Sequence, residues 1–218
     1  MSTHTLTQII PMNADSFYAI TETPEFDQFQ VPYMGINSLE LKEERDEGDV
    51  IFRKVCVKPK TSVPAILLKF SSGKSEVSYE DTQLKSKVKR EILFKTNPPL
   101  LSENIFIEGT ITVEPLDDNN CLKVQKINFR FTGPLQWFSS MIEANILSEL
   151  KKTMETLPKV VLAYKKHLSD NNIPLPVFKP IALNPAPQNY NRNNIPSQPK
   201  SPILNNKEPV AQYVCKIN

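Results

Sequence analysis

The feature that most constrains the fold is a long apolar stripe in the second half of the chain. Its residues recur at steps of three or four, a spacing that keeps them on one face of a helix. A helix of about 35 residues would be roughly 50 Å long at about 1.5 Å per residue, so it needs a large partner surface. The stripe consists of Phe138, Ile142, Ile146, Leu150, Met154, Leu157, Val161, Tyr164 and Leu168.

Glycine and proline set the expected limits of this helix. Gly133 and Pro134 break the preceding segment and open the helix. Pro158 lies inside the helix, lacks a backbone N–H and is expected to kink it after Leu157. The half from Pro134 to Leu157 is therefore predicted to be the lid of a cavity. The half beyond Pro158 is predicted to pack over the sheet edge.

Two strand-like runs come directly before the helix. Between Ile105 and Val113 apolar and polar residues alternate, which is the period of a half-buried strand. In Leu122–Phe131 the apolar face switches part-way along, and this slip predicts a β-bulge that curves the sheet. The polar turn Asp117–Asn120 joins the two runs.

The first hundred residues supply the remaining elements. The order predicts an α+β fold, in which an antiparallel sheet of about six or seven strands partners one long C-terminal helix. Two short helices are expected after the first strand. The predicted elements are a strand at Thr3–Ile10, a helix at Ala14–Ile20 capped by Asn13, a helix from Pro24, strands at Ile36–Arg45 and Asp49–Val57, a helix at Val63–Phe70, and a hairpin between Lys74 and Asn97 with strands at Ser75–Asp81 and Gln83–Thr96.

The composition changes after Ser169. Residues 170–218 hold nine of the 19 prolines and many asparagines, and they carry no periodic apolar face. Such a segment cannot bury enough apolar surface to offset its ordering entropy. We therefore expect one domain at residues 1–169 and a disordered tail at 170–218.

Charge and cysteine content bound the partners and the compartment. A net charge of +2 gives no reason to expect a nucleic-acid partner. Cys56, Cys121 and Cys215 are odd in number and far apart, which favours a reduced intracellular compartment over a disulfide framework. No apolar run is long enough to span a membrane, and Met1–Pro11 lacks the features of a secretory signal. The expected location is the cytoplasm, either free or at a membrane surface.

Four stretches carry a resemblance to a known group of proteins. They read ADSFYAITETPEF, VPAILLKFSSGKSEVSYED, IFIEGTITVEP and INFRFTGPLQWFSSMIEANI. In this order the chain resembles the START-like, helix-grip (SRPBCC or Bet v 1-type) superfamily over residues 1–169, and looks most like an uncharacterised START-like family. The resemblance implies a curved antiparallel sheet that grips the long helix around an apolar cavity. It also implies that a sterol, phospholipid or other hydrophobic small molecule binds there.

The helix and the two strands before it supply the candidate lining of that cavity. The alternative is that these residues are simply core, and for any single residue the core interpretation is favoured. Trp137 and Phe138 lie in the first helical turn, where they would act as a packing anchor or, second, as a gate. The candidate ligand-binding residues are Ile105, Ile107, Ile111, Phe129, Phe131, Trp137, Met141 and Ile142.

The predicted function is binding of a lipid or other hydrophobic small molecule, with transfer as an extension. The alternative is an interaction adaptor that uses the domain as a scaffold and the tail to recruit partners. No catalytic residue, cofactor or metal set is predicted, because the five glycines form no phosphate-binding motif and His4 and His167 have no neighbouring ligands. A cyclase-type enzyme is the third hypothesis, since its acid–base groups can be isolated cavity residues.

Lysines alternate in the second hairpin. Lys85, Lys87 and Lys89 would share one face of a strand and could hold the domain against an anionic membrane surface. The alternative is an edge strand that lysines protect from aggregation.

Two signals lie in the tail. Cys215 is four residues from the C-terminus, the position that a prenylation signal requires, although Lys216 and Asn218 do not fit the usual pattern. A chance cysteine is the favoured interpretation. Prolines at 196, 199 and 202 have the PxxP spacing of ligands for SH3-type partners.

Overall fold

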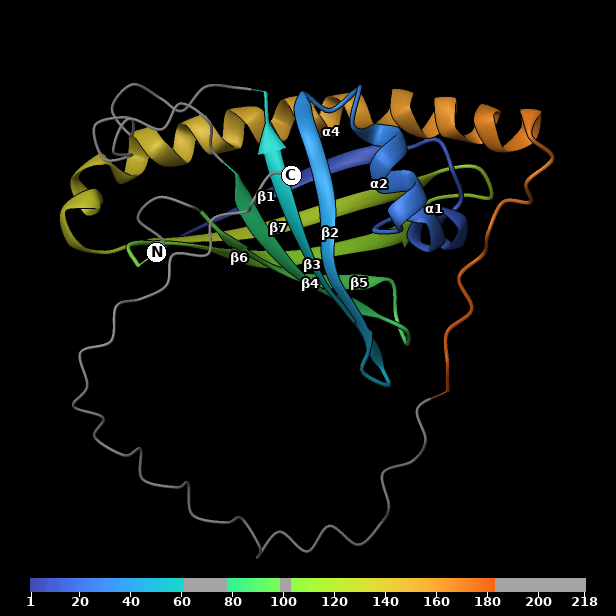
Figure 1. Ribbon diagram of the computed structural model, residues 1–218, viewed down its shortest axis with the longest axis horizontal. Helices are drawn as coiled ribbons and strands as arrows, with labels where there is room; N and C mark the ends of the chain where they lie inside the picture. Colours follow the sequence, from blue (N-terminus) through green and yellow to red (C-terminus); the bar gives the residue numbers. More distant parts are fainter. Residues whose placement is uncertain (61–77, 99–102, 183–218) are drawn as a thin grey trace, which may run out of the picture. The chain divides into compact units, whose positions relative to one another are not determined.

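The computed structural model describes residues 1–60, 78–98 and 103–182. The predicted helix Val63–Phe70 lies outside these residues. Every other predicted helix and strand has a counterpart (Figure 1). The turn of the hairpin predicted between Lys74 and Asn97 lies at residues 87–90 and not at Thr82, so the predicted second strand is divided between two strands. The elements are β1 (Ser2–Ile10), α1 (Ala14–Ile20), α2 (Pro24–Gln30), β2 (Ile36–Asp46), β3 (Val50–Pro59), β4 (Tyr79–Ser86), β5 (Glu91–Asn97), β6 (Ile105–Pro115), β7 (Cys121–Phe131), the 3₁₀ helix η1 (Gly133–Phe138) and α4 (Ser139–Asp170).

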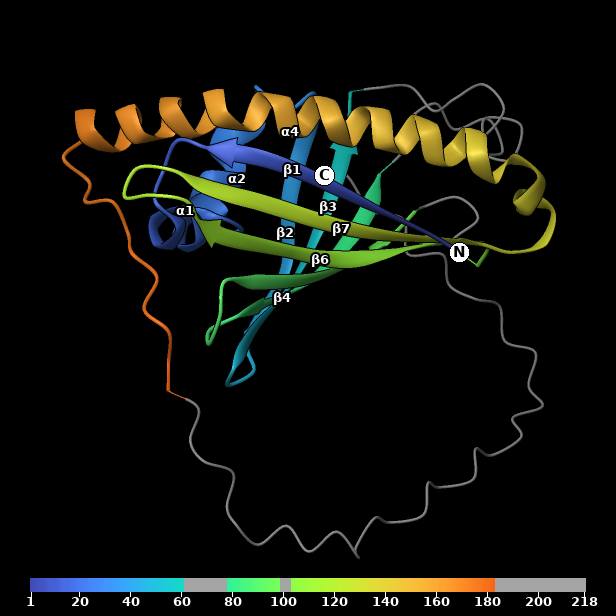
Figure 2. The same ribbon diagram turned by 180° about the vertical axis from the view of Figure 1, so that it is seen from behind.

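The seven strands form one antiparallel sheet. Its order is β1-β7-β6-β5-β4-β3-β2, so β1 and β2 are the edges and each of the five strands between them is paired on both sides. Figures 1 and 2 show α4 running along β1 across one face of this sheet. The predicted α+β class, a curved antiparallel sheet with one long C-terminal helix, is confirmed. We call the face that packs against α1, α2 and α4 the inner face.

Local chemistry explains the two short helices. The Asn13 side chain accepts a hydrogen bond of 2.8 Å from the Ser16 backbone N–H, which caps α1 as predicted. Thr23 caps α2 and Pro24 occupies its first turn, where the missing N–H does no harm. The buried Phe17 of α1 and Phe26 of α2 then point into the core.

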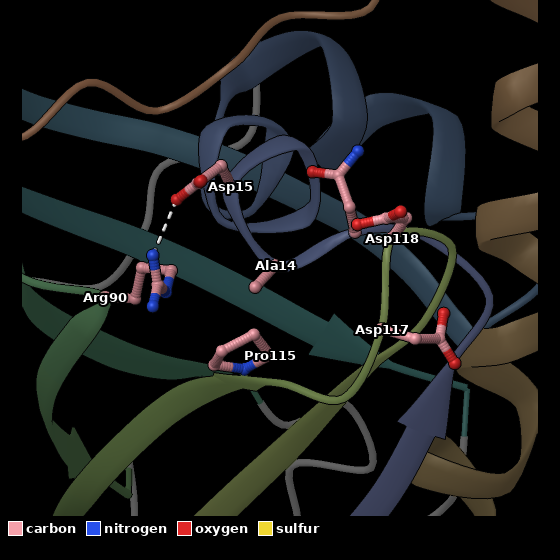
Figure 3. A pocket seen from close by; sticks show the side chains of 7 residues that line it. Ala14, Asp15, Arg90, Pro115, Asp117 and Asp118 are labelled. Carbon is pink, nitrogen blue, oxygen red and sulfur yellow. Dashed lines mark hydrogen bonds and ion pairs between the residues drawn. The ribbon is translucent and has the colours of Figure 1, made fainter.

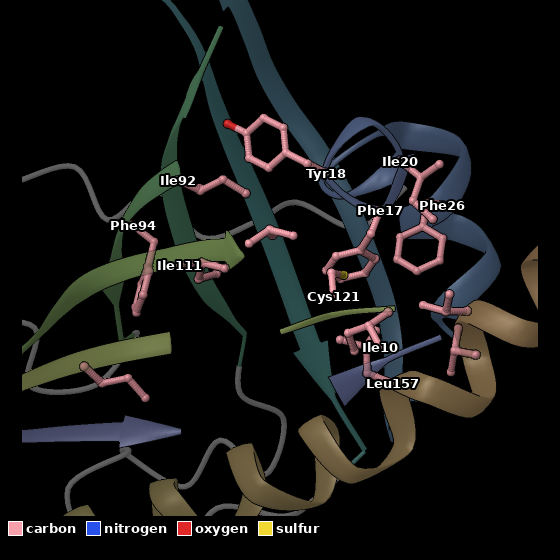
Figure 4. Close-up of a cluster of buried hydrophobic side chains, with 14 of the residues drawn as sticks. Ile10, Phe17, Tyr18, Ile20, Phe26, Ile92, Phe94, Ile111, Cys121 and Leu157 are labelled. Atoms are coloured by element: carbon pink, nitrogen blue, oxygen red, sulfur yellow. The ribbon is translucent and has the colours of Figure 1, made fainter. Parts of the chain in front are cut away.

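That core lies between the inner face and the helices (Figure 4). Ile10 and Cys121, at the ends of paired strands, meet Phe17 of α1 and Leu157 of α4 there. Cys56 and Cys121 are both buried in strands, where small side chains pack well. We call this end of the sheet the helical end, and the opposite end, where Ser2 pairs with Phe129, the open end.

The predicted bulge in β7 is wrong. β7 pairs with both β1 and β6 in an unbroken register. The apolar pattern switches because Lys123 and Gln125 occupy inner-face positions that apolar residues would normally take. Irregular register occurs instead in β2, between Ile36 and Ser38 and between Leu41 and Glu43. The sequence pattern thus marked a change of chemistry and not a change of geometry.

Two glycines meet geometric demands. A Cβ at Gly109 of β6 would collide with the backbone carbonyl oxygen of Lys126, so the two strands approach in a way that only glycine permits. Gly133 has a φ of +59° at the start of η1, a left-handed conformation that glycine adopts without strain. The expected break between β7 and the helical segment therefore lies where it was predicted.

α4 runs unbroken from Ser139 to Asp170, so Pro158 does not divide it. The packing nevertheless differs between its two halves. Before residue 154 only Ile142 of α4 is buried, whereas the remaining buried residues lie from Met154 to Leu168. The C-terminal half thus packs tightly at the helical end. The N-terminal half buries less apolar surface and is held to β1 at the open end by Glu143, which pairs with Ser2 and His4. No helix in the described ranges is long and apolar enough to cross a membrane.

The domain extends past the predicted boundary at residue 169. Leu175 and Phe178 pack against the core although they lie in no helix or strand. The Phe178 ring meets the Tyr18 ring edge-on at 4.6 Å, and the Ile181 backbone N–H donates to the carbonyl of Lys87 at 2.9 Å. Residues 171–181 therefore belong to the compact unit Met1–Ile181, and the proline-rich composition hid these anchoring apolar side chains.

Candidate functional site

The predicted lining residues fall into two groups. Ile105, Ile107, Ile111, Phe129 and Ile142 are all buried in the core, and Phe131 packs against it. Trp137 and Met141 are instead 90% and 49% exposed. The packing-anchor interpretation of Trp137 is therefore wrong.

Trp137 is exposed because of the path that η1 takes. It carries Leu135 inward, where that residue is buried, and this rotation leaves Trp137 facing solvent. Phe138 is also exposed by 40%. The start of the helical segment is thus an exposed aromatic surface above the open end of the sheet.

The inner face carries a second set of residues that the sequence reasoning missed. Arg53 of β3 is completely buried, and its guanidinium contacts three carboxylates. Nη2 donates to Asp27 Oδ2 at 2.6 Å, Nη1 to Glu22 Oε2 at 3.2 Å and Nε to Glu44 Oε2 at 3.1 Å. Nη1 also donates to Gln83 Oε1 at 3.3 Å. These bonds fasten the α1–α2 corner to the sheet.

Lys85 belongs to the same part of the interior, so its prediction as a membrane-facing residue is wrong. Its ammonium donates to the carbonyl of Thr21 and lies 5.1 Å from the centre of the Tyr18 ring. Burial lowers the pKa of Lys85 to about 8, against the opposing effect of Glu22. Lys87 and Lys89 follow the end of β4 and lie in the turn before β5. The three lysines therefore share no strand face, and β4 is not an edge strand.

A third polar group lies toward the open end. Asp81 of β4 pairs across the sheet with Thr96 of β5, whose hydroxyl donates to the Asp81 carboxylate. Burial raises the pKa of Asp81 to about 6, while the hydrogen bonds from Thr96 and Gln83 oppose that rise. Burial also raises the pKa of the neighbouring Tyr79. A carboxyl group with this pKa exchanges protons readily near neutral pH.

Glu22 links these groups electrostatically. It lies in the corner between α1 and α2 with a φ of +58°, and its negative charge acts on Asp27, Lys85 and Asp81. Burial, followed by this charge, raises the pKa of Asp27 in spite of the salt bridge to Arg53. The interior of the fold is therefore amphipathic, with ionisable groups set among apolar ones.

Two surface hollows complete the geometry. A polar hollow of about 420 Å³ lies beside α1, where Arg90 Nη1 pairs with Asp15 Oδ1 at 2.7 Å and Asp117 and Asp118 form the rim (Figure 3). A smaller one of about 220 Å³ lies between the edge strand β1 and α4. None of the eight predicted lining residues borders either hollow.

Sequence signals for the missed residues existed. In β7 the switch of the apolar face was visible, and it marked Lys123 and Gln125. In β3 the alternation of Arg53 with Val55 and Val57 placed a charge on an otherwise apolar face. Both patterns require the inner side of each strand to be known, which depends on contacts with distant helices.

Comparisons with known proteins support the fold. No protein-family model and no curated protein matches the chain. Among solved structures it is similar to the protein TTHA0849 from Thermus thermophilus, with 16% identity, a TM-score of 0.54, and coverage of 75% of this chain and 99% of that one. It is also similar to the Zhui aromatase/cyclase from Streptomyces sp. R1128, with 11% identity, a TM-score of 0.54, and coverage of 77% of this chain and 95% of that one.

A point mutant of norcoclaurine synthase from Thalictrum flavum, in complex with a transition-state analogue, is also similar. It gives 14% identity, a TM-score of 0.52, and coverage of 75% of this chain and 96% of that one. At these identities the similarity establishes the fold alone. The helix-grip fold implied by the sequence resemblance is thereby confirmed.

Proposed function

We propose that this protein binds a hydrophobic small molecule between the inner face of the sheet and the N-terminal half of α4. The observation that carries the proposal is the uneven packing of α4. Its apolar stripe continues through Ile146 and Leu150, yet these residues are only half-buried, whereas the stripe beyond Met154 is buried. An apolar surface that the described residues do not cover fully is suited to a ligand.

Two further observations support this location. Ile107 and Phe129 of the inner face lie in the same cross-strand row as Thr96 and Asp81, so an apolar floor adjoins polar groups. Ligand pockets usually combine an apolar lining with a few polar groups that set orientation. The solved neighbours of this fold include an aromatase/cyclase and a norcoclaurine synthase, two proteins named for small-molecule chemistry.

A fluorescence titration tests the proposal. Trp137, the single tryptophan, lies at the exposed start of the helical segment and reports on events at that end. Titration with the neutral probe N-phenyl-1-naphthylamine should saturate at one equivalent and change the tryptophan emission. An Ile146→Asp variant, in the half-buried part of the α4 stripe, should lose probe binding, whereas Leu116→Asp, in an exposed turn, should retain it. Absence of saturable binding to the wild-type protein would rule the proposal out.

A second candidate function is a proton-transfer reaction on the bound molecule. It is favoured by Asp81, a half-buried carboxyl group with a pKa of about 6 on the inner face. Such a group can give or take a proton near neutral pH. In an enzyme, Asp81→Asn would accumulate substrate, and because proton transfer within a molecule gives an isomer of equal mass, the molecules extracted from the variant and the wild type would differ in chromatographic retention. In a simple binding protein the two extracts would be identical.

Transfer between membranes and recruitment of partners are finer proposals. The exposed Trp137 and Phe138 support contact with a membrane surface, since aromatic side chains favour that interface. SH3-type partners and a lipid on Cys215 would act through the tail. Deletion of residues 183–218 separates these roles, because a ligand-binding domain keeps its ligand and an adaptor loses its partners. The deletion begins at 183 because residues 171–181 pack on the domain.

A further inference from the structure

Two polar residues of β7 lie on the inner face among apolar neighbours. Lys123 and Gln125 alternate along the strand with Ile127 and Phe129, which are fully buried. Their cross-strand neighbours are Val113 and Ile111 on one side and Gln8 and Leu6 on the other. Both side chains therefore project from the middle of the inner face into the interior.

Within residues 1–60, 78–98 and 103–182, neither side chain has a hydrogen-bond or ion-pair partner. Gln125 is only 9% exposed. In these ranges, the only fully buried side-chain nitrogen or oxygen without a hydrogen-bond partner is Ser16 Oγ. The polar atoms of Gln125 and Lys123 are therefore not fully buried, and they keep some solvent-accessible surface.

The other interior cations are already satisfied. Arg53 has three carboxylate partners, and Lys85 donates to backbone carbonyls. Glu22 raises the pKa of Lys123 from a distance, yet burial outweighs this effect and the pKa of Lys123 is lowered. An ammonium that is largely but not fully buried and has no counter-charge is unfavourable, and an anion beside it would remove that penalty.

The hollow between β1 and α4 lies next to this pair. It is lined in part by Leu6 and Gln8, the cross-strand neighbours of Gln125 and Lys123, and by the buried Met154 of α4. Lys151 and Glu155 contribute one charge of each sign to its rim. The hollow therefore lies at the sheet edge, one strand away from Lys123 and Gln125, which do not line it themselves.

We propose that Lys123 and Gln125 bind the oxyanion group of the ligand, so the ligand is a hydrophobic anion such as a long-chain or aromatic carboxylate. This inference rests on the proposed function and names the chemistry of the molecule bound. The ammonium supplies the charge and the amide a second hydrogen-bond donor, a combination suited to a carboxylate or sulfonate. The apolar body of the ligand lies along the neighbouring Ile127, Phe129 and Ile111.

A matched pair of probes tests the inference. 1-Anilinonaphthalene-8-sulfonate and N-phenyl-1-naphthylamine share one aromatic body and differ in the sulfonate. Oleate and oleyl alcohol, used as competitors, repeat the comparison with a carboxylate. Affinities are measured by fluorescence titration of the full-length wild type, Lys123→Met, Gln125→Leu and Lys126→Met. Lys126 is the control, since it lies on the same strand, is exposed and points to the outer face.

The wild type is expected to bind the sulfonate probe and oleate more tightly than their neutral counterparts. Lys123→Met should weaken anion binding by about tenfold, as expected for loss of a charge-assisted hydrogen bond, and leave the neutral probe within about twofold. Gln125→Leu should weaken anion binding by less, and Lys126→Met should change neither. Lys123→Met should also unfold at the same or a higher temperature, which verifies that the variant is folded.

Two results would overturn the inference. Equal affinity of the wild type for charged and neutral partners is one. A Lys123→Met variant that keeps the wild-type preference for the charged partner is the other. Either result leaves the proposed function standing, because the neutral probe still binds. Failure of both probes to bind would refute the proposed function itself, so the two failures are distinguishable.

Discussion

Arg53 is the residue on which the architecture of the interior most depends. Its fully buried guanidinium compensates Asp27, which is also buried, together with Glu22 and Glu44. Such a cluster contributes little net stability when it is complete, because desolvation offsets attraction. It becomes strongly destabilising when one member is removed.

The first prediction concerns this cluster. Arg53→Met should lower the free energy of unfolding by about 3–5 kcal/mol, because it leaves buried carboxylates without a partner. The matched variant Arg45→Met removes an arginine from exposed pairs with Glu43 and Glu47, and should change stability by less than about 1 kcal/mol. Urea unfolding followed by circular dichroism measures both. Similar losses in the free energy of unfolding for the two variants would show that breaking the buried network costs no more than breaking an exposed ion pair.

A second prediction concerns the pH dependence that Asp81 imposes. Its pKa is raised to about 6 in the fold, so the folded state binds more protons than the unfolded state between about pH 4 and 6. Stability from this group is therefore full below that window and is lost as the pH rises through it. Asp81→Asn, which resembles the protonated form, should stabilise the protein at pH 7 by about 1 kcal/mol and flatten this part of the profile.

Asp118→Asn is the control for that measurement, since Asp118 lies in the exposed turn between β6 and β7. Thermal unfolding at pH 4, 5, 6 and 7 gives the profiles. A variant at Asp81 that is less stable than the wild type at pH 7 would mean that the carboxylate is satisfied and not strained.

At the residue scale, the sequence could identify core positions better than polar ones. Five of the eight lining candidates are buried, because an alternating strand and a periodic stripe mark the inward side. Lys85 was misplaced because its strand ends at Ser86, and only contact with α1 reveals where it points. Polar residues follow no periodicity of their own. Their environment depends on which distant element supplies a partner.

At the scale of elements, α4 combines two kinds of packing in one helix. The stripe was evident from the sequence, yet periodicity says nothing about how closely the facing surface fits. Pro158 removes one backbone hydrogen bond from α4. The helix continues past it because its neighbours Leu157, Val160 and Val161 are buried, and this packing offsets the lost bond. The division of α4 is thus one of burial and not of helical geometry.

The third prediction compares the two halves. Leu157→Ala should destabilise the protein by about 2–5 kcal/mol, as is typical for a buried leucine. Ile146→Ala should have a clearly smaller effect, and Trp137→Ala should lie within about 0.5 kcal/mol of the wild type, because that side chain is 90% exposed. Urea unfolding is the measurement. A large loss in the free energy of unfolding for Trp137→Ala would support the interpretation of Trp137 as a packing anchor.

At the scale of the whole molecule, the order of elements was sufficient to predict the fold. A strand, two short helices, a run of antiparallel strands and a final long helix admit few arrangements, because each apolar face must be covered. The end of the domain was less predictable. Leu175 and Phe178 lie among prolines, and their packing depends on Tyr18 and the turn before β5, which no local pattern reveals.

The fourth prediction concerns that extension. A chain that ends at Ala182 should keep the stability of the full-length protein. A chain that ends at Asp170 loses the contacts of Phe178 and Ile181, and should unfold a few degrees lower, since about 1 kcal/mol corresponds to roughly 2–4 °C in a domain of this size. Differential scanning fluorimetry compares the two. Equal melting temperatures would return the boundary to residue 169.

The central claim is that the grip between sheet and helix holds a small hydrophobic molecule. Native mass spectrometry of the full-length protein, purified from cells without detergent, tests it most directly. The expected spectrum has a species heavier than the chain by one small molecule, which disappears on denaturation and extracts into organic solvent as a hydrophobic acid. A spectrum with the bare chain alone, combined with no saturable binding of oleate added afterwards, would contradict the claim.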